Sequence, residues 1–114
     1  MSPQIPANIT PQRQVAAIPP VAREILIKAI YDLDPAHKVR LRLLESGIKR
    51  SDRSVMDWLK KVRIWLDFPG HYPCTTSEVY KAAVVDCRSR NGMPTAAEIA
   101  AGWEPAAASR TTQS

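Results

Sequence analysis

Apolar residues recur at helical spacing along the segment Ser51–Gly70. Counted from the first of them, they follow at i+3, i+4, i+7, i+10 and i+11, as Val55, Trp58, Leu59, Val62, Trp65 and Leu66. This spacing places them on one face of an α-helix, because a helix completes a turn in about 3.6 residues. We predict a helix that has Ser51 or Asp52 as N-cap, ends before Phe68 and buries this face in the core. A tryptophan of this face that is exposed would instead be an interface anchor.

Two helices are predicted before this segment. The stretch Val21–Leu33 has a broad apolar face, which is typical of a helix at the centre of a core. Asp34 and Pro35 have the character of an N-cap and a first helical residue, and the helix that they start ends at residue 45 or 46. Gly47 follows, and glycine suits the left-handed conformation in which many helices end.

Two more helices are predicted after it. Thr75 to Glu78 match a capping box, in which a threonine hydroxyl and a glutamate side chain satisfy each other's backbone amides. The apolar face of the helix that follows consists of Val79, Tyr80, Ala83, Val84 and Cys87. A turn with Gly92 at positive φ then leads to a second capping box, Thr95–Glu98, and to a short helix that Gly102 closes.

The two ends of the chain differ in composition from the middle. Residues 1–20 contain five of the ten prolines and one charged residue, Arg13. Proline lacks an amide donor and disfavours helix at the residue before it, so we predict an extended arm over residues 1–19. Two interpretations stay open: a disordered arm, or a docking strap whose apolar side chains fill a groove, namely Ile5, Ile9, Val15 and Ile18. Residues 104–114 are small and polar and are predicted to form a short flexible tail. The predicted fold class is all-α, with a compact five-helix domain over residues 20–103.

Basic residues are concentrated in the middle of the chain. The segment Lys38–Arg63 contains nine Lys or Arg and three Asp or Glu, a net charge of +6 in a chain whose total is +5. Clustered cations favour phosphate binding, because each contact releases counterions. The predicted binding residues are Lys38, Arg40, Arg42, Lys49, Arg50, Arg53, Lys60 and Lys61.

These cations support two hypotheses of function. The first is a small non-enzymatic regulator that binds nucleic acid through the basic surface of the second and third predicted helices. The second is a protein-interaction module, an inhibitor or adaptor of the phage or mobile-element type, that binds an acidic surface of a larger host complex. The association with phages and mobile elements is made at the level of fold and size. Either kind of protein could be an oligomer.

The segment Val84–Trp103 resembles the start of a winged helix-turn-helix domain like that of the LexA repressor. The matching residues are Gly92, Met93, Pro94, Thr95, Glu98, Ile99, Ala100, Gly102 and Trp103. They follow that family's order of a buried helix, a Gly-Pro turn and a Thr-initiated helix closed by a Gly-aromatic pair. The family continues with a recognition helix and a β-wing, whereas eleven residues follow Trp103 here. The resemblance therefore implies a helix–turn–helix hairpin but not that family's mode of reading DNA, and a capped hairpin without a binding role is the alternative interpretation.

Little in the sequence indicates catalysis, a cofactor or a metal. Four scattered glycines cannot build a phosphate-binding loop. The spacing of His71 and Cys74 suits zinc, but a structural site needs a tetrahedral ligand set, and beyond Cys87 only the distant His37 remains. Two cysteines are too few for a disulfide scaffold, and no apolar run approaches the roughly 18–20 residues that span a bilayer. The first residues also lack the pattern of a secretory signal. We therefore expect a cytoplasmic protein that is not an enzyme, holds no metal or cofactor and does not bind membranes.

Overall fold

The computed structural model describes residues 11–68 and 77–106. Within these two ranges the chain forms α-helices and no strands. The helices are α1 (Pro11–Ala16), α2 (Pro20–Asp32), α3 (Ala36–Glu45), α4 (Asp52–Trp65), α5 (Glu78–Asn91) and α6 (Ala96–Ala100). The predicted compact all-α fold is confirmed, with one helix more than the five that the sequence predicts.

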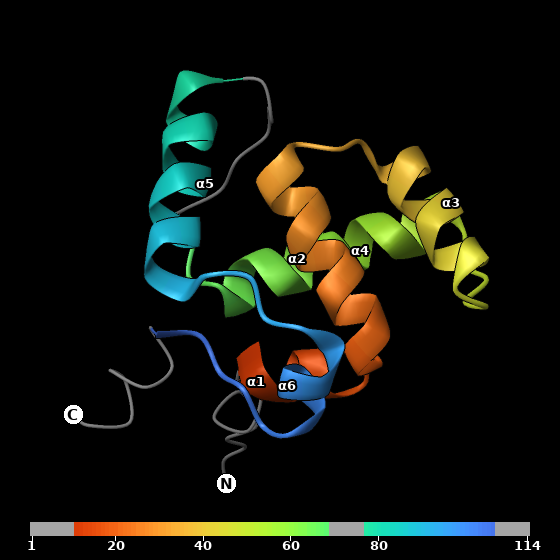
Figure 1. The fold of residues 1–114 in the computed structure, drawn as a ribbon. Helices are drawn as coiled ribbons and strands as arrows, with labels where there is room; N and C mark the ends of the chain where they lie inside the picture. The colour runs from red at the N-terminus through yellow and green to blue at the C-terminus, as the bar shows by residue number, and fades with distance from the viewer. Residues whose placement is uncertain (1–10, 69–76, 107–114) are drawn as a thin grey trace, which may run out of the picture.

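Helices α2 and α4 form the centre of the molecule. Figure 1 shows α4 crossing behind α2, with α3 and α5 on opposite sides of α2. Helix α4 packs against α1, α2 and α3, and helix α2 also packs against α5 and α6. The core therefore lies where α2 and α4 cross, and the smaller helices cover it from the sides.

The apolar face of α4 is buried as predicted. Val55 and Val62 are fully buried, and Trp65 is 2% exposed. The rings of Trp65 and Trp103 form a T-shaped pair with 5.5 Å between their centroids, and this contact joins α4 to the segment after α6. Trp58 is 8% exposed, so both tryptophans of α4 belong to the core.

The extended arm predicted for residues 1–19 is wrong for Pro11–Ala16, which form α1. Proline is tolerated in a first helical turn, because the amide that it lacks has no partner there. Val15 and Ile18 are almost fully buried, and α1 packs on α4, so these two side chains dock as the alternative interpretation expected. The other two residues of the proposed strap, Ile5 and Ile9, lie outside the described residues.

A buried arginine connects the residues after α1 to the central helices α2 and α4. Arg23 of α2 donates from Nε to the carbonyl oxygen of Ile18 at 2.9 Å. Its guanidinium lies 5.4 Å from the ring centroid of Trp65, within the range of a cation–π contact. Burial lowers the pKa of Arg23 from the ordinary value of an arginine. One side chain thus links the end of the α1 segment, α2 and α4.

Several helix boundaries follow the predicted capping signals. Ser51 is the N-cap of α4 and accepts the backbone amide of Ser54 at 3.1 Å. Thr95 and Glu98 form the predicted capping box at the start of α6. Gly47 adopts φ +86° after α3, where the chain leaves the helix in a left-handed conformation. Each of these signals involves residues within about one turn of the helix end, so it can be recognised from the local sequence.

Two predicted helix starts are displaced. Helix α3 begins at Ala36 with Pro35 as its N-cap, and the side chain of Asp34 binds cations instead of capping. Helix α5 is capped by Ser77, whose hydroxyl accepts the amide of Tyr80. The predicted cap Thr75 lies outside the described residues. In both cases a neighbouring residue takes the capping position, an error of one or two residues.

The structured domain extends beyond the predicted boundary at Trp103. Pro105 is among the most buried residues, and the amide of Ala106 donates to Asn91 Oδ1 at 2.8 Å. The predicted tail over residues 104–114 therefore starts too early, because its first residues pack against the end of α5. Beyond residue 106 the chain lies outside the described residues.

Removal of a core tryptophan from α4 should unfold most of the protein. We expect Trp65→Ala or Trp58→Ala to lower the free energy of unfolding by about 3–5 kcal/mol, because each leaves a large cavity in the core. That loss is comparable to the total stability of many domains, about 5–15 kcal/mol. Thermal melts measure it, and a variant that melts within a degree or two of the wild type would show that the residue is not core.

The turn between α5 and α6 should require glycine. Gly92 has φ +70° and ψ −163°, a conformation that only glycine adopts readily, and its carbonyl accepts the hydroxyl of Tyr31 at 2.8 Å. A Cβ at this position would meet no atom within 4 Å, so any loss comes from the backbone alone. We expect Gly92→Ala to destabilise the protein by about 1–3 kcal/mol, measured by urea denaturation.

Leu33 offers the opposite change at the end of α2. This residue has φ +60°, a backbone conformation that is strained for residues other than glycine, and its side chain is partly exposed. We expect Leu33→Gly to leave stability unchanged or to raise it by up to about 1 kcal/mol. A loss as large as that of Gly92→Ala would contradict this account of both turns.

Candidate nucleic-acid interface

Two of the predicted cations on α3 bind a carboxylate at the junction of α2 and α3. Arg42 Nη1 lies 2.6 Å from Asp34 Oδ2, and Lys38 Nζ lies 3.9 Å from Asp34 Oδ1. The side chain of Asp34 is only 11% exposed. Because solvent screens this site little, part of the charge of both cations is balanced within the protein.

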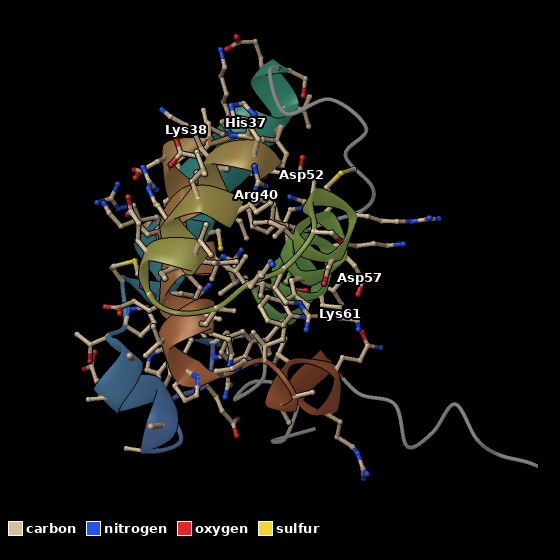
Figure 2. All side chains as sticks on the ribbon, turned by 90° about the vertical axis from the view of Figure 1, so that its right-hand side faces the viewer. His37, Lys38, Arg40, Asp52, Asp57 and Lys61 are labelled. Atoms are coloured by element: carbon tan, nitrogen blue, oxygen red, sulfur yellow. The ribbon has the colours of Figure 1, made fainter. Side chains whose placement is uncertain are left out.

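Two more of the predicted cations pair with exposed carboxylates. Arg40 Nε donates to Asp52 Oδ1 at 2.7 Å, and Lys61 Nζ lies 3.1 Å from Asp57 Oδ2. Figure 2 shows Arg40 and Asp52 between α3 and α4, with Asp57 and Lys61 further along α4. Exposed pairs of this kind contribute about 0–1 kcal/mol, so an incoming phosphate can displace the carboxylate at small cost.

The remaining four predicted cations have no carboxylate within 4.0 Å in the part of the chain that the structure describes. We call this group the α4 cations, and it consists of Lys49, Arg50, Arg53 and Lys60. All four side chains are exposed. Two come from the loop that precedes α4 and two from α4 itself, so they supply positive charge that no described carboxylate balances.

Arg50 is held in place at the start of α4. Its Nε donates to the hydroxyl of Ser54 at 2.8 Å, and its guanidinium lies 4.3 Å from the ring centroid of Trp58. The guanidinium therefore lies over the Trp58 ring in a cation–π interaction. The arrangement limits the motion of the guanidinium, so less conformational entropy is lost when its other N–H groups bind an anion.

Arg53 and Lys60 lie on the same face of α4, opposite its buried stripe. Successive residues of a helix are rotated by roughly 100°, so residues seven apart point in nearly the same direction. Met56 and Ile64 lie on this face as well and are 58% and 46% exposed. The outward face of α4 thus combines cations with exposed apolar side chains.

The single basic surface predicted from the sequence is therefore divided. Arg40 and Arg42 contact carboxylates on different sides of α3. Because both are paired, neither belongs to the group of cations without a carboxylate partner. The prediction from the sequence did not include the carboxylates that bind these cations. The pairs of Asp34 with Lys38 and Asp57 with Lys61 have the i, i+4 spacing that signals such contacts. The pair of Arg40 and Asp52 depends on how α3 packs against α4, which no local spacing reveals.

The segment that resembles a helix-turn-helix consists of α5, the turn at Gly92 and α6, and both helices pack against α2. Helix α6 has five residues, packs against α2 and buries Ile99. After it, Ala106 is the last described residue, so no recognition helix lies in the described part of this segment. The buried residues of both helices contribute to the core, and α6, the helix that follows the turn, is less than two turns long.

Other kinds of site receive no support from the described residues. Among residues 11–68 and 77–106, no three His, Cys, Asp or Glu side chains are placed to share a metal ion. His71 and Cys74 lie outside those ranges, and burial raises the pKa of the Cys87 thiol. None of the described helices has the length and apolar composition that crossing a bilayer requires. Comparison of the chain with protein-family models, with curated proteins and with solved structures found no match.

Proposed function

We propose that this protein is a small non-enzymatic regulator that binds nucleic acid through the α4 cations. The observation that carries the proposal is the local excess of charge: four exposed cations without a described carboxylate partner, at and just before one helix. The chain as a whole has a net charge of +5, so its attraction to polyanions is not cancelled at longer range.

The physical basis of this binding is counterion release. A nucleic acid condenses cations along its phosphates, and a protein cation that replaces them frees those ions into solution. Lys49 and Arg53 are exposed and make no described ion pair, so they can approach a phosphate without first breaking a contact. Arg40 and Lys61 lie at the edges of the group and can join it when their exposed carboxylate partners are displaced.

A second candidate is a protein partner with an acidic surface. Leu41 and Leu44 on the outward side of α3 are 47% and 48% exposed, and apolar side chains contribute more to a protein interface than to phosphate binding. Such a partner would bind α3 and the α4 cations together. Phosphate contacts are strong at about 50 mM salt. Purified protein that shifts no nucleic-acid probe at this salt concentration but still binds one host protein would favour this second candidate.

Removal of two α4 cations should change the salt dependence of binding. We expect the affinity for a random duplex to fall with salt at a log–log slope of about −0.9 per neutralised phosphate. The double variant Lys49→Gln/Arg53→Gln should make that slope shallower by up to about two units, measured by gel shift or fluorescence anisotropy.

A matched control removes the same charge elsewhere. Lys28 of α2 and Lys81 of α5 each pair with a carboxylate on their own helix. The variant Lys28→Gln/Lys81→Gln should therefore keep the wild-type slope. Equal changes in both double variants would attribute binding to net charge and not to the α4 cations, and the absence of any shift at low salt would overturn the proposed function.

A further inference from the structure

Helix α4 presents a continuous outward face along its whole length. We call it the α4 outer face, and it consists of Arg53, Met56, Asp57, Lys60 and Ile64, spaced at i, i+3, i+4, i+7 and i+11. All five side chains are exposed. The buried stripe on the other side fixes this orientation, because it packs against α1, α2 and α3.

The other described helices expose fewer cations without a carboxylate partner. On α3, Leu41 and Leu44 are exposed, but Lys38 pairs with Asp34. The outward side of α5 carries Val79, Ala82, Val85 and Ser89, and its neighbour Lys81 pairs with Glu78. On α2 the exposed Lys28 pairs with Asp32, and α1 and α6 are each less than two turns long. Among the helices of residues 11–68 and 77–106, α4 is therefore the best suited to contact a polyanion along its length.

The α4 outer face matches the edges of base pairs in the major groove. Arginine and lysine donate to guanine O6 and N7, aspartate accepts from the amino group of cytosine, and an apolar side chain contacts the thymine methyl group. The α4 outer face carries all three kinds of side chain: Arg53 and Lys60 are the donors, Asp57 is the acceptor, and Met56 is the apolar side chain.

The dimensions of the helix also agree with the groove. Helix α4 has 14 residues, and at about 1.5 Å per residue it is roughly 21 Å long. The major groove of B-form DNA is about 12 Å wide and admits an α-helix. Lys49 and Arg50 precede the helix, where a strand of the backbone passes when the helix lies in the groove.

We propose that α4 is a reading helix that lies in the major groove of duplex DNA, with its outer face on the base edges and Lys49 and Arg50 on phosphates. This inference rests on the proposed function and narrows it to B-form duplex DNA with a base preference. Duplex RNA is excluded as a good ligand, because the major groove of the A-form helix is deep and too narrow for side chains to read.

Selection from a randomised duplex DNA pool by the full-length protein tests the inference. The expected result is an enriched sequence with guanine and thymine positions. Lys60→Gln should weaken binding to the selected duplex by about tenfold relative to an unselected duplex, the size of one lost base contact. Met56→Ala should relax the preference at a thymine position. Met93→Ala, at an exposed methionine of the α5–α6 turn, is the matched control and should retain it.

The possible outcomes separate this inference from the proposed function. A pool that shows no enrichment, or equal affinity for duplex DNA and duplex RNA, would overturn the reading helix while leaving nucleic-acid binding in place. Failure to bind any of these probes at low salt would overturn the proposed function and the inference with it. Because all three substituted side chains are exposed, melting temperatures equal to that of the wild type should show that each variant is folded.

Discussion

Burial of one face of α4 is the interaction on which the rest of the structure depends. Val55, Val62 and Trp65 lie on that face and are at most 2% exposed. The face packs against α1, α2 and α3, so three separate segments of the chain are ordered around it. Because a helix that buries one side must expose the other, the same packing determines which α4 residues meet solvent. The fold and the proposed binding surface are therefore two sides of one element.

Electrostatics then divides the exposed cations into two groups. Three of the cations pair with aspartates: Arg42 with Asp34, Arg40 with Asp52, and Lys61 with Asp57. The α4 cations have no described carboxylate partner. A count of charges along the sequence cannot separate these groups, because both lie in the same basic segment. What distinguishes them is the position of each carboxylate in the folded chain. The proposed binding surface is therefore smaller than the one predicted from the sequence, because the cations without a described carboxylate partner lie on α4 and the loop before it.

The sequence predicted those parts of the fold that local interactions determine. The period of apolar residues in α4, the N-cap at Ser51 and the capping box at Thr95 each depend on neighbours within one or two turns. Helix α1 was not predictable in this way, since a segment of only six residues does not form a stable helix alone. Burial of Val15 and Ile18 against the core supplies the stability that the local sequence lacks. The basic segment of the candidate site was likewise predictable from the sequence. Which of its cations pair with a carboxylate was not predictable, because that depends on how the helices pack.

The central claim is that the outward face of α4 is the binding surface, and backbone amide NMR of the labelled protein titrated with duplex DNA tests it most directly. The account predicts that the largest chemical-shift changes occur from Lys49 to Ile64, and that the signals of α5 and α6 change little. These changes should diminish as salt is raised, because phosphate contacts weaken with ionic strength. The largest changes along α5 and α6, or an unchanged spectrum at low salt, would contradict it.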